Sequence, residues 1–377
     1  MNLLQIVGIL TSLSYPLFVH STPLSFEEEN GLFQYLVNTC HVNRGFYDSQ
    51  VDIATSMYIY KLVEFDEQNE AMTIFATFTL KWHSECILWE KNATKLGITH
   101  VSFPANLWWR PKILHISAVD DVQAVAINGD NLNMNFFPNG WIEWSPTGPW
   151  KTRCELTLLK FPFDTQTCYF AFELWDTEAF TNLTSSFAMT DIQHPDKVTS
   201  DMLIWQIESV NSRLEPVCFP MSTPPKIFCA SQVIFSITVK RKAEPYIFSI
   251  FLPTIALSIL QLSPLAIPPQ FPERATYSVT VLLAFAVINQ LIQSAIPQTA
   301  EIVYLVIYVG FTVIIGTICT LYSVFSIILW EKSGETRKIS IYGRQLSLVT
   351  FLDVTFLSVC IIVLIIVNIV FFILFKT

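Results

Sequence analysis

The sequence is poor in charged residues, and above all in basic ones. Only 14% of its 377 residues are Asp, Glu, Lys or Arg, whereas soluble domains typically contain about 25%. Much of the chain is therefore expected to lie in lipid. The formal net charge is −9, from 22 Lys and Arg against 31 Asp and Glu. Because nucleic-acid binding requires a basic patch, the composition argues against a nucleic-acid partner.

The sequence also lacks the short motifs that usually mark an enzyme or a metal site. It contains no HExxH, no glycine-rich phosphate loop, no GxSxG and no zinc-like cysteine spacing. Its six histidines are scattered, with no two at a metal-ligand spacing. We therefore predict a protein that is not an enzyme and that has no cofactor and no metal.

The N-terminal part of the chain is predicted to lie outside the cell. Residues 1–21 form an apolar run ending in small residues, as in a cleaved secretory signal peptide, with a signal anchor as the alternative. Two glycosylation sequons, at Asn92 and Asn182, precede the first long apolar segment. Six cysteines also precede it, and fifteen pairings of six are possible. These cysteines are Cys40, Cys86, Cys154, Cys168, Cys218 and Cys229.

Residues 22–242 are predicted to form one β-rich domain. An amphipathic pattern over residues 26–38 predicts a short helix. Beyond it, runs of β-branched and aromatic residues, such as 57–63 and 72–80, alternate with turn residues. Similar runs recur up to residues 233–239. Many short strands separated by turns predict a β-sandwich of about 200 residues.

Residues 243–377 are predicted to form a transmembrane domain. Its four apolar segments are each long enough to cross a bilayer core of ~30 Å as a helix. The link over residues 330–347 contains four basic residues, which predicts a cytoplasmic position. Four crossings after a cleaved signal would place both termini outside. The segments are residues 246–267, 274–296, 302–329 and 348–375.

The second apolar segment carries polar residues that would be costly to expose to lipid. Six residues spaced alternately by four and three positions fall on one helical stripe. Helices grouped around an axis would enclose a water path, and an apolar constriction could gate it by dewetting. A polar face buried between helices is the alternative. The stripe consists of Thr276, Thr280, Leu283, Val287, Gln290 and Ser294.

One short segment carries a resemblance to a known family. Between Cys154 and Cys168 lies the run Phe161-Pro162-Phe163-Asp164. This segment resembles the signature loop of the Cys-loop (pentameric) ligand-gated ion channels. Within that family the chain is nearest to nicotinic acetylcholine- and serotonin-type cation channel subunits, as a divergent, invertebrate-like member. The resemblance covers nearly the whole mature chain, except the link at 330–347, which is far shorter than in most animal members.

The resemblance implies an immunoglobulin-like extracellular β-sandwich followed by a four-helix transmembrane bundle. It implies a pentamer made with four other identical or related subunits in the bilayer. It also implies a disulfide between Cys154 and Cys168. A second bridge, between Cys218 and Cys229, resembles one found in glycine-receptor-like members.

The resemblance also places Glu273 at the inner mouth of the pore. Five copies would form a ring of carboxylates, which favours cations. Anion-selective members typically have Pro-Ala-Arg here, whereas this chain has Pro272 followed by Glu273 and Arg274. Na⁺ and K⁺ are therefore the expected permeant ions, with Ca²⁺ as a further candidate. Ser294 departs from the acid that many cation channels have at the outer end, so an anion-selective channel is the alternative.

The ligand site implied by the resemblance lies between two subunits. Trp175, seven residues after Cys168, matches the binding-site tryptophan of acetylcholine- and serotonin-type receptors, and its ring suits a cation. Trp82 resembles the aromatic that the neighbouring subunit contributes. Glu143 and Ser145 are expected on that neighbouring face, opposite Trp144.

Two departures from the family pattern affect the predicted ligand site. Ile116 stands where acetylcholine receptors usually have tyrosine, and the hairpin at 218–229 lacks adjacent cysteines and tyrosines. Phe219 or Phe228 could supply an aromatic wall instead. This incomplete cage is compatible with a small amine agonist such as acetylcholine. It also keeps open a non-gating accessory subunit of a heteromeric receptor.

Coupling between the two domains is expected at their junction. Phe161, Pro162, Phe163 and Asp164 would contact it from the loop. Arg241, twelve residues before Pro253, matches the family's pre-membrane arginine and would bridge to that loop. Motion would then reach the link that begins at Pro297, whereas simple anchoring of the basic residues at lipid headgroups is the alternative. Taken together, these features predict a multi-pass receptor of the plasma membrane. A postsynaptic membrane is a candidate location.

Overall fold

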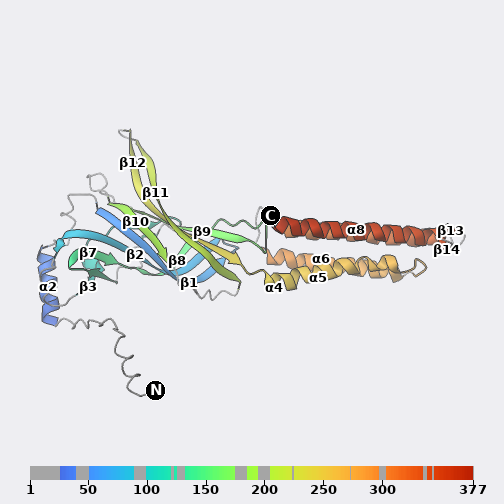
Figure 1. The fold of residues 1–377 in the computed structure, drawn as a ribbon, viewed down its shortest axis with the longest axis horizontal. Helices are drawn as coiled ribbons and strands as arrows, with labels where there is room; N and C mark the ends of the chain where they lie inside the picture. Colours follow the sequence, from blue (N-terminus) through green and yellow to red (C-terminus); the bar gives the residue numbers. More distant parts are fainter. Residues whose placement is uncertain are drawn as a thin grey trace, which may run out of the picture.

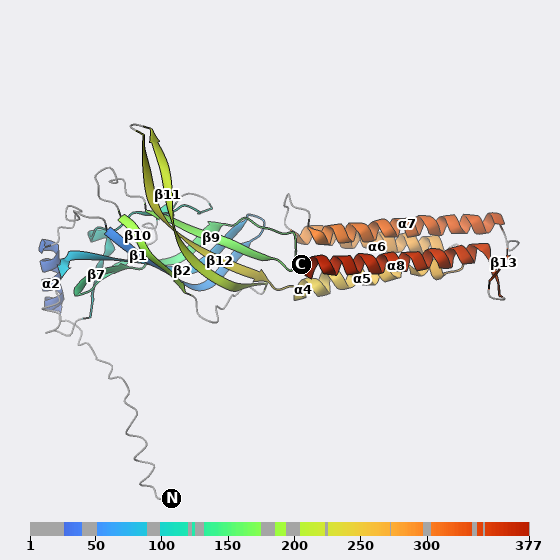
Figure 2. The same cartoon turned by 45° about the horizontal axis from the view of Figure 1, so that its top comes forward.

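The molecule is elongated, with a β-rich half and a helical half joined end to end (Figure 1). A second view, turned by 45°, shows the same two halves (Figure 2). This computed structural model describes residues 26–39, 51–88, 99–119, 123–124, 132–174, 185–193, 204–222, 225–271, 273–296, 303–333, 338–341 and 344–376.

The first sheet of the β-rich half has seven strands, in the order β10-β1-β2-β7-β6-β3, with β8 also paired to β2. The strand β1 pairs in parallel with β10 and antiparallel with β2. The bounds are β1 (Val51–Asp66), β2 (Ala71–Leu88), β3 (Val101–Pro104), β6 (Asn133–Phe136), β7 (Asn139–Trp144), β8 (Thr147–Arg153) and β10 (Ser185–Gln193).

The second sheet has five strands, in the order β11-β12-β9-β4-β5. The strands β11 and β12 remain paired over their full length and project beyond the body of the sandwich (Figures 1 and 2). The bounds are β4 (Ile113–His115), β5 (Gln123–Ala124), β9 (Thr165–Leu174), β11 (Trp205–Ser222) and β12 (Pro225–Arg241).

The core of this half lies between the sheets and is rich in aromatic rings. Phe78 of β2 stacks on Phe172 of β9 with a centroid distance of 4.4 Å. The Trp150 indole is buried and donates a hydrogen bond to the Ala76 carbonyl oxygen, at 3.1 Å. Alternate residues of each strand reach this core because successive side chains point to opposite faces. The predicted β-sandwich is confirmed.

The predicted N-terminal helix is also present, as α2 (Phe26–Thr39). Its Leu36 is fully buried, and its Phe33 ring lies 4.9 Å from the ring of Phe103 in β3. A short 3₁₀ turn, η1 (Ala105–Leu107), follows β3. The helix therefore covers one end of the sandwich.

The helical half contains four helices long and apolar enough to cross a membrane, within the part of the chain that the structure describes. The first is irregular. Proline lacks an amide hydrogen and clashes with the carbonyl four residues before it, so Pro253 accounts for the preceding π-helical turn. This segment consists of α4 (Glu244–Tyr246), η4 (Ile247–Phe251), α5 (Leu252–Leu260) and η5 (Ser263–Ala266).

The other three candidate spans are regular helices: α6 (Glu273–Ala295), α7 (Tyr304–Ser333) and α8 (Leu348–Lys376). The helix α7 ends at Ser333, four residues later than the predicted end of the third segment. It thus occupies the start of the predicted link. A two-stranded ladder of β13 (Lys338–Ile341) and β14 (Arg344–Ser347) connects α7 to α8.

Candidate functional site

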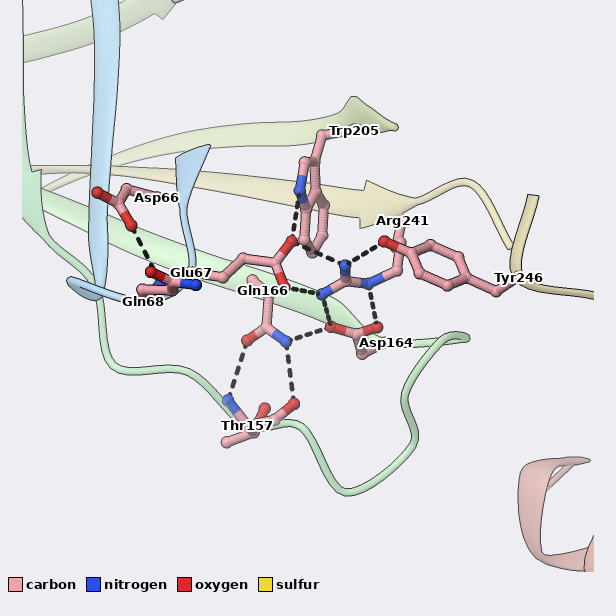
Figure 3. A network of polar contacts seen from close by, with 9 residues as sticks. All are labelled: Asp66, Glu67, Gln68, Thr157, Asp164, Gln166, Trp205, Arg241 and Tyr246. Atoms are coloured by element: carbon pink, nitrogen blue, oxygen red, sulfur yellow. Dashed lines mark hydrogen bonds and ion pairs between the residues drawn. The ribbon is translucent and has the colours of Figure 1, made fainter. Parts of the chain in front are cut away.

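An ion-paired arginine lies where the β-sandwich meets the helices (Figure 3). Arg241 ends β12, and its side chain is 0% exposed. Its Nε donates to Asp164 Oδ1 at 2.7 Å. Its Nη1 and Nη2 donate to the two carboxylate oxygens of Glu67, at 2.8 and 2.9 Å. Such charge-assisted, two-pronged contacts fix geometry as well as charge.

Aromatic rings enclose this guanidinium. Its carbon lies 4.2 Å from the ring centroid of Trp205, 4.7 Å from that of Phe161 and 5.6 Å from that of Tyr246. Burial by itself lowers the pKa of Arg241, but the hydrogen bonds and negative charges of Glu67 and Asp164 raise it above its ordinary value. Arg241 is therefore a permanent cation between two anions.

Gln166 holds one of those carboxylates in place. Its Nε2 donates to Asp164 Oδ2 at 2.6 Å and to the Thr157 carbonyl oxygen at 2.9 Å. Its Oε1 accepts from the Thr157 amide at 3.0 Å (Figure 3). Arg241 and Asp164 are predicted from the sequence, whereas Gln166 and Glu67 are not. An acidic turn residue such as Glu67 gives no sequence signal of a partner 174 positions away.

The loop between Cys154 and Cys168 reaches the helical half. The disulfide between these cysteines is present. The Leu159 carbonyl oxygen accepts a hydrogen bond from the Tyr304 amide, at the start of α7. The ring of Phe163, which is 41% exposed, lies 6.2 Å from the ring of Phe251 in η4.

Within the same loop, Phe161 and Pro162 are buried. Pro297, the predicted start of the responding link, lies outside the described residues. The loop thus contacts the membrane half at two helix starts.

The seven residues predicted to line a pore all lie on the exposed face of α6. Leu283 is 65% exposed and Val287 54% exposed. The other five are also exposed: Glu273, Thr276, Thr280, Gln290 and Ser294. The opposite face packs on the same subunit through Arg274, Ser278, Val281, Phe285 and Ile292, all buried. The predicted stripe therefore points away from its own bundle.

Two hydroxyl groups on this stripe donate back to their own helix. Thr280 Oγ1 donates to the Thr276 carbonyl oxygen at 2.8 Å. Ser294 Oγ donates to the Leu291 carbonyl oxygen, also at 2.8 Å. Both hydroxyl hydrogens are thereby occupied.

The structure corrects the expected position of Trp82. Its side chain is 0% exposed and lies edge-on to Trp109, at 5.9 Å between ring centroids. A ligand outside the subunit cannot reach it there. The cause is the strand period of two: in β2 the exposed neighbours of Trp82 are Lys81 and His83.

The other residues predicted for the neighbouring face do lie together. Glu143 forms an ion pair with Lys81 at 2.8 Å. It also accepts a hydrogen bond from the Ser145 hydroxyl at 3.4 Å. Trp144 between them is buried on the opposite side, as expected. Trp82 pairs with Ile142 and shares the buried side. The structure therefore separates Trp82 from Glu143 and Ser145.

Several further predictions lie partly or wholly outside what the structure describes. Those wholly outside are the signal peptide at 1–21, Asn92, Trp175 and Asn182. The register of β11 and β12 places Cys218 opposite Cys229 and Phe219 opposite Phe228. The backbone is thus suited to the predicted second bridge, which stays a prediction. Ile116 is half-buried, next to β4.

One further candidate for the ligand site is not predicted from the sequence. Glu173 lies on β9, two positions before Trp175, and is only 6% exposed. Strand pairing places it between Leu114 of β4 and Gln232 of β12. Burial raises the pKa of its carboxyl group. A lone acid in an otherwise apolar run, Phe170-Ala171-Phe172-Glu173-Leu174, was the available sequence signal.

The fold defines a two-part protein, in which a β-sandwich contacts a bundle of helices long and apolar enough to cross a membrane. Residues 32–243 match the family described as neurotransmitter-gated ion-channel ligand binding domain. This match covers more than half of the chain, so the chain belongs to that family. The predicted family is therefore confirmed. Because the members are ion channels, the expectation that the chain is not an enzyme is confirmed as well.

Curated relatives agree with this assignment. The chain is 26% identical over 304 residues to acetylcholine receptor subunit alpha-type acr-16 of Caenorhabditis elegans, covering 79% of this chain and 58% of the relative. It is 25% identical over 298 residues to neuronal acetylcholine receptor subunit alpha-4 of Gallus gallus, covering 78% and 45%. It is 26% identical over 291 residues to subunit beta-2 of Carassius auratus, covering 76% and 60%. The matches thus span about half the length of these relatives.

Proposed function

We propose that this chain is a subunit of a ligand-gated ion channel, which forms a cation-selective pore with four identical or related subunits. A small extracellular agonist, an amine, opens it. The α6 stripe carries this proposal: a helix long enough to cross a membrane exposes seven pore-type residues and buries its other face. Such a face requires water or a partner helix rather than lipid.

Cation selectivity rests on Glu273. The carboxylate is exposed at the first turn of α6, and a ring of acids at a pore mouth attracts cations and repels anions. The permeant ions are then Na⁺ and K⁺, with Ca²⁺ as a further candidate. An anion-selective channel is the alternative, and a reversal potential distinguishes the two.

The proposed amine ligand rests on two residues that are close in the sequence. Glu173 is a buried carboxyl group near the end of β9, and Trp175 lies two positions later in the sequence. A carboxylate beside an aromatic face attracts an ammonium group through charge and through the π system. The curated relatives are acetylcholine receptor subunits, so acetylcholine is the first ligand to test.

The proposed location is the plasma membrane, with both termini outside and a postsynaptic site as one candidate. An accessory subunit that does not gate by itself is the second candidate function, because Ile116 and the 218–229 hairpin depart from the usual ligand cage. Recording from cells that express this chain alone separates the two candidates.

The pore assignment is tested by cysteine accessibility. Cysteine replaces Thr276, Thr280 or Val287 on the exposed stripe and, as a matched control, Ser278 or Phe285 on the buried face. A charged aqueous thiol reagent, applied during agonist exposure, should change the current only in the stripe variants. If the chain expressed alone gives no current, it is co-expressed with an acetylcholine receptor subunit, and the same test is then applied. If the stripe cysteines stay unmodified in conducting cells, the pore assignment is wrong.

A further inference from the structure

A second buried ion pair lies within the membrane half, directly behind the pore stripe. Arg274 follows Glu273 in α6, but its side chain is 0% exposed and points to the bundle side. Its Nη1 lies 2.8 Å from Oδ2 of Asp353 in α8, and its Nη2 lies 3.4 Å from Oδ1. Two adjacent residues of opposite charge therefore lie on different faces of the pore helix, one exposed and one buried.

The remaining contacts of this pair hold it firmly. The Arg274 Nε donates to Ser323 Oγ at 2.9 Å, and its Nη1 donates to the Ile267 carbonyl oxygen at 3.2 Å. Ser326 Oγ donates to Asp353 Oδ1 at 2.8 Å. The pair thus joins α6, α7, α8 and the segment that ends the first span.

The charges at the inner mouth depend on this arrangement. The guanidinium of an arginine is a cation in proteins, so only a counter-charge can cancel the field of Arg274. Asp353 is that counter-charge, and its side chain is 5% exposed. Within the described residues, Glu273 has no ion pair of its own and its side chain is exposed, so it remains available to the pore.

We infer that Asp353 is a positioning residue for ion selectivity, although it lies on α8, which is not the pore helix. By neutralising Arg274 and holding it on the bundle side, Asp353 leaves the Glu273 ring unopposed. The inference rests on the proposed cation channel. Intramembrane ionisable residues are costly to keep, and this role gives a functional reason for the cost.

The test measures reversal potentials in NaCl gradients. Asp353→Asn leaves Arg274 charged, with Glu273 as its neighbouring acid, and should lower the cation-to-anion permeability ratio about threefold or more. Arg274→Gln with Asp353→Asn removes both charges and should restore the ratio. Asp353→Glu should preserve it. Ser326→Ala is the matched control, because it removes two hydrogen bonds to the pair and keeps the ion pair itself.

An unchanged ratio in Asp353→Asn channels, with normal surface labelling, overturns the inference. If this variant does not reach the surface alone, wild-type and variant transcripts are co-expressed, and the ratio must still fall wherever labelling detects the variant. A wild-type channel that prefers anions refutes the proposed function instead. Even then, the inference still requires Asp353→Asn to shift the ratio further toward anions.

Discussion

Individual buried charges in this chain fall into two groups. Arg241 and Arg274 each lie against carboxylates at hydrogen-bond distance. Burial of a charge without a partner costs several kcal/mol, and these ion pairs avoid that cost for the two arginines. Glu173 differs, because the contacts described for it are strand pairings with uncharged residues, and burial raises its pKa. It is a buried acid two positions before Trp175, so under the proposed function it is a candidate partner for the ligand ammonium.

We therefore expect Glu173→Gln to weaken activation by acetylcholine about tenfold, or ~1.4 kcal/mol. The variant keeps the shape of the side chain and removes its charge. Dose–response curves give the shift. Glu215→Gln is the control, because Glu215 is exposed and paired with Arg213. Equal potency in wild type and Glu173→Gln would assign the ammonium to another group.

His115 predicts a pH dependence of stability. It is 1% exposed, stacks on Phe172 at 4.8 Å, and burial lowers its pKa from 6.5 to about 4. The unfolded chain takes up this proton below pH ~6.5, whereas the folded chain does so only near pH 4. Stability therefore falls as the pH decreases through this window, by about 2 kcal/mol between pH 6.5 and 5.

Thermal unfolding of the purified chain in detergent, followed by tryptophan fluorescence, measures this effect. His115→Phe should reduce the decrease in melting temperature between pH 6.5 and 5. A variant with the same pH dependence as wild type would contradict the assignment of this proton to His115.

Among the elements, α6 gives the most direct prediction. Leu283 lies at the middle of the exposed stripe and is 65% exposed in one subunit. An apolar ring closes a pore by excluding water, so Leu283→Ser should lower the agonist concentration for half-maximal opening about tenfold, ~1.4 kcal/mol, or cause a leak current. Val279→Ser, exposed but off the stripe, should have a smaller effect. Two-electrode recording measures both.

The elements also show what the sequence could predict. The α6 stripe was predictable because helical period alone determines which residues share a face. Trp82 was not, because alternation divides a strand into two faces without saying which one is buried. Glu67 lies 174 positions from Arg241, and Asp353 lies 79 positions from Arg274. Such contacts depend on the tertiary fold, which is why Glu67 and the role of Asp353 could not be read from local patterns.

At the scale of the whole molecule, the Arg241 cluster joins the β-sandwich to the helices. We expect Glu67→Gln and Arg241→Gln to be non-additive in a double-mutant cycle on agonist potency, with a coupling energy of about 1–3 kcal/mol. The exposed Arg213 and Glu215 pair is the control, with an expected coupling below about 1 kcal/mol. Additive effects at Arg241 would mean that the cluster stabilises the fold without transmitting opening.

The back-bonded hydroxyls of Thr280 and Ser294 have a consequence for ions in transit. Since each hydroxyl hydrogen is directed at a main-chain carbonyl, only oxygen lone pairs remain to face the central axis. Around a fivefold axis, these lone pairs would form two rings of partial negative charge. One ring would lie on each side of Leu283 and Val287. Such rings replace part of the hydration shell of a sodium or potassium ion and offer nothing to chloride. Discrimination of charge would therefore begin before an ion reaches the carboxylates of the inner mouth.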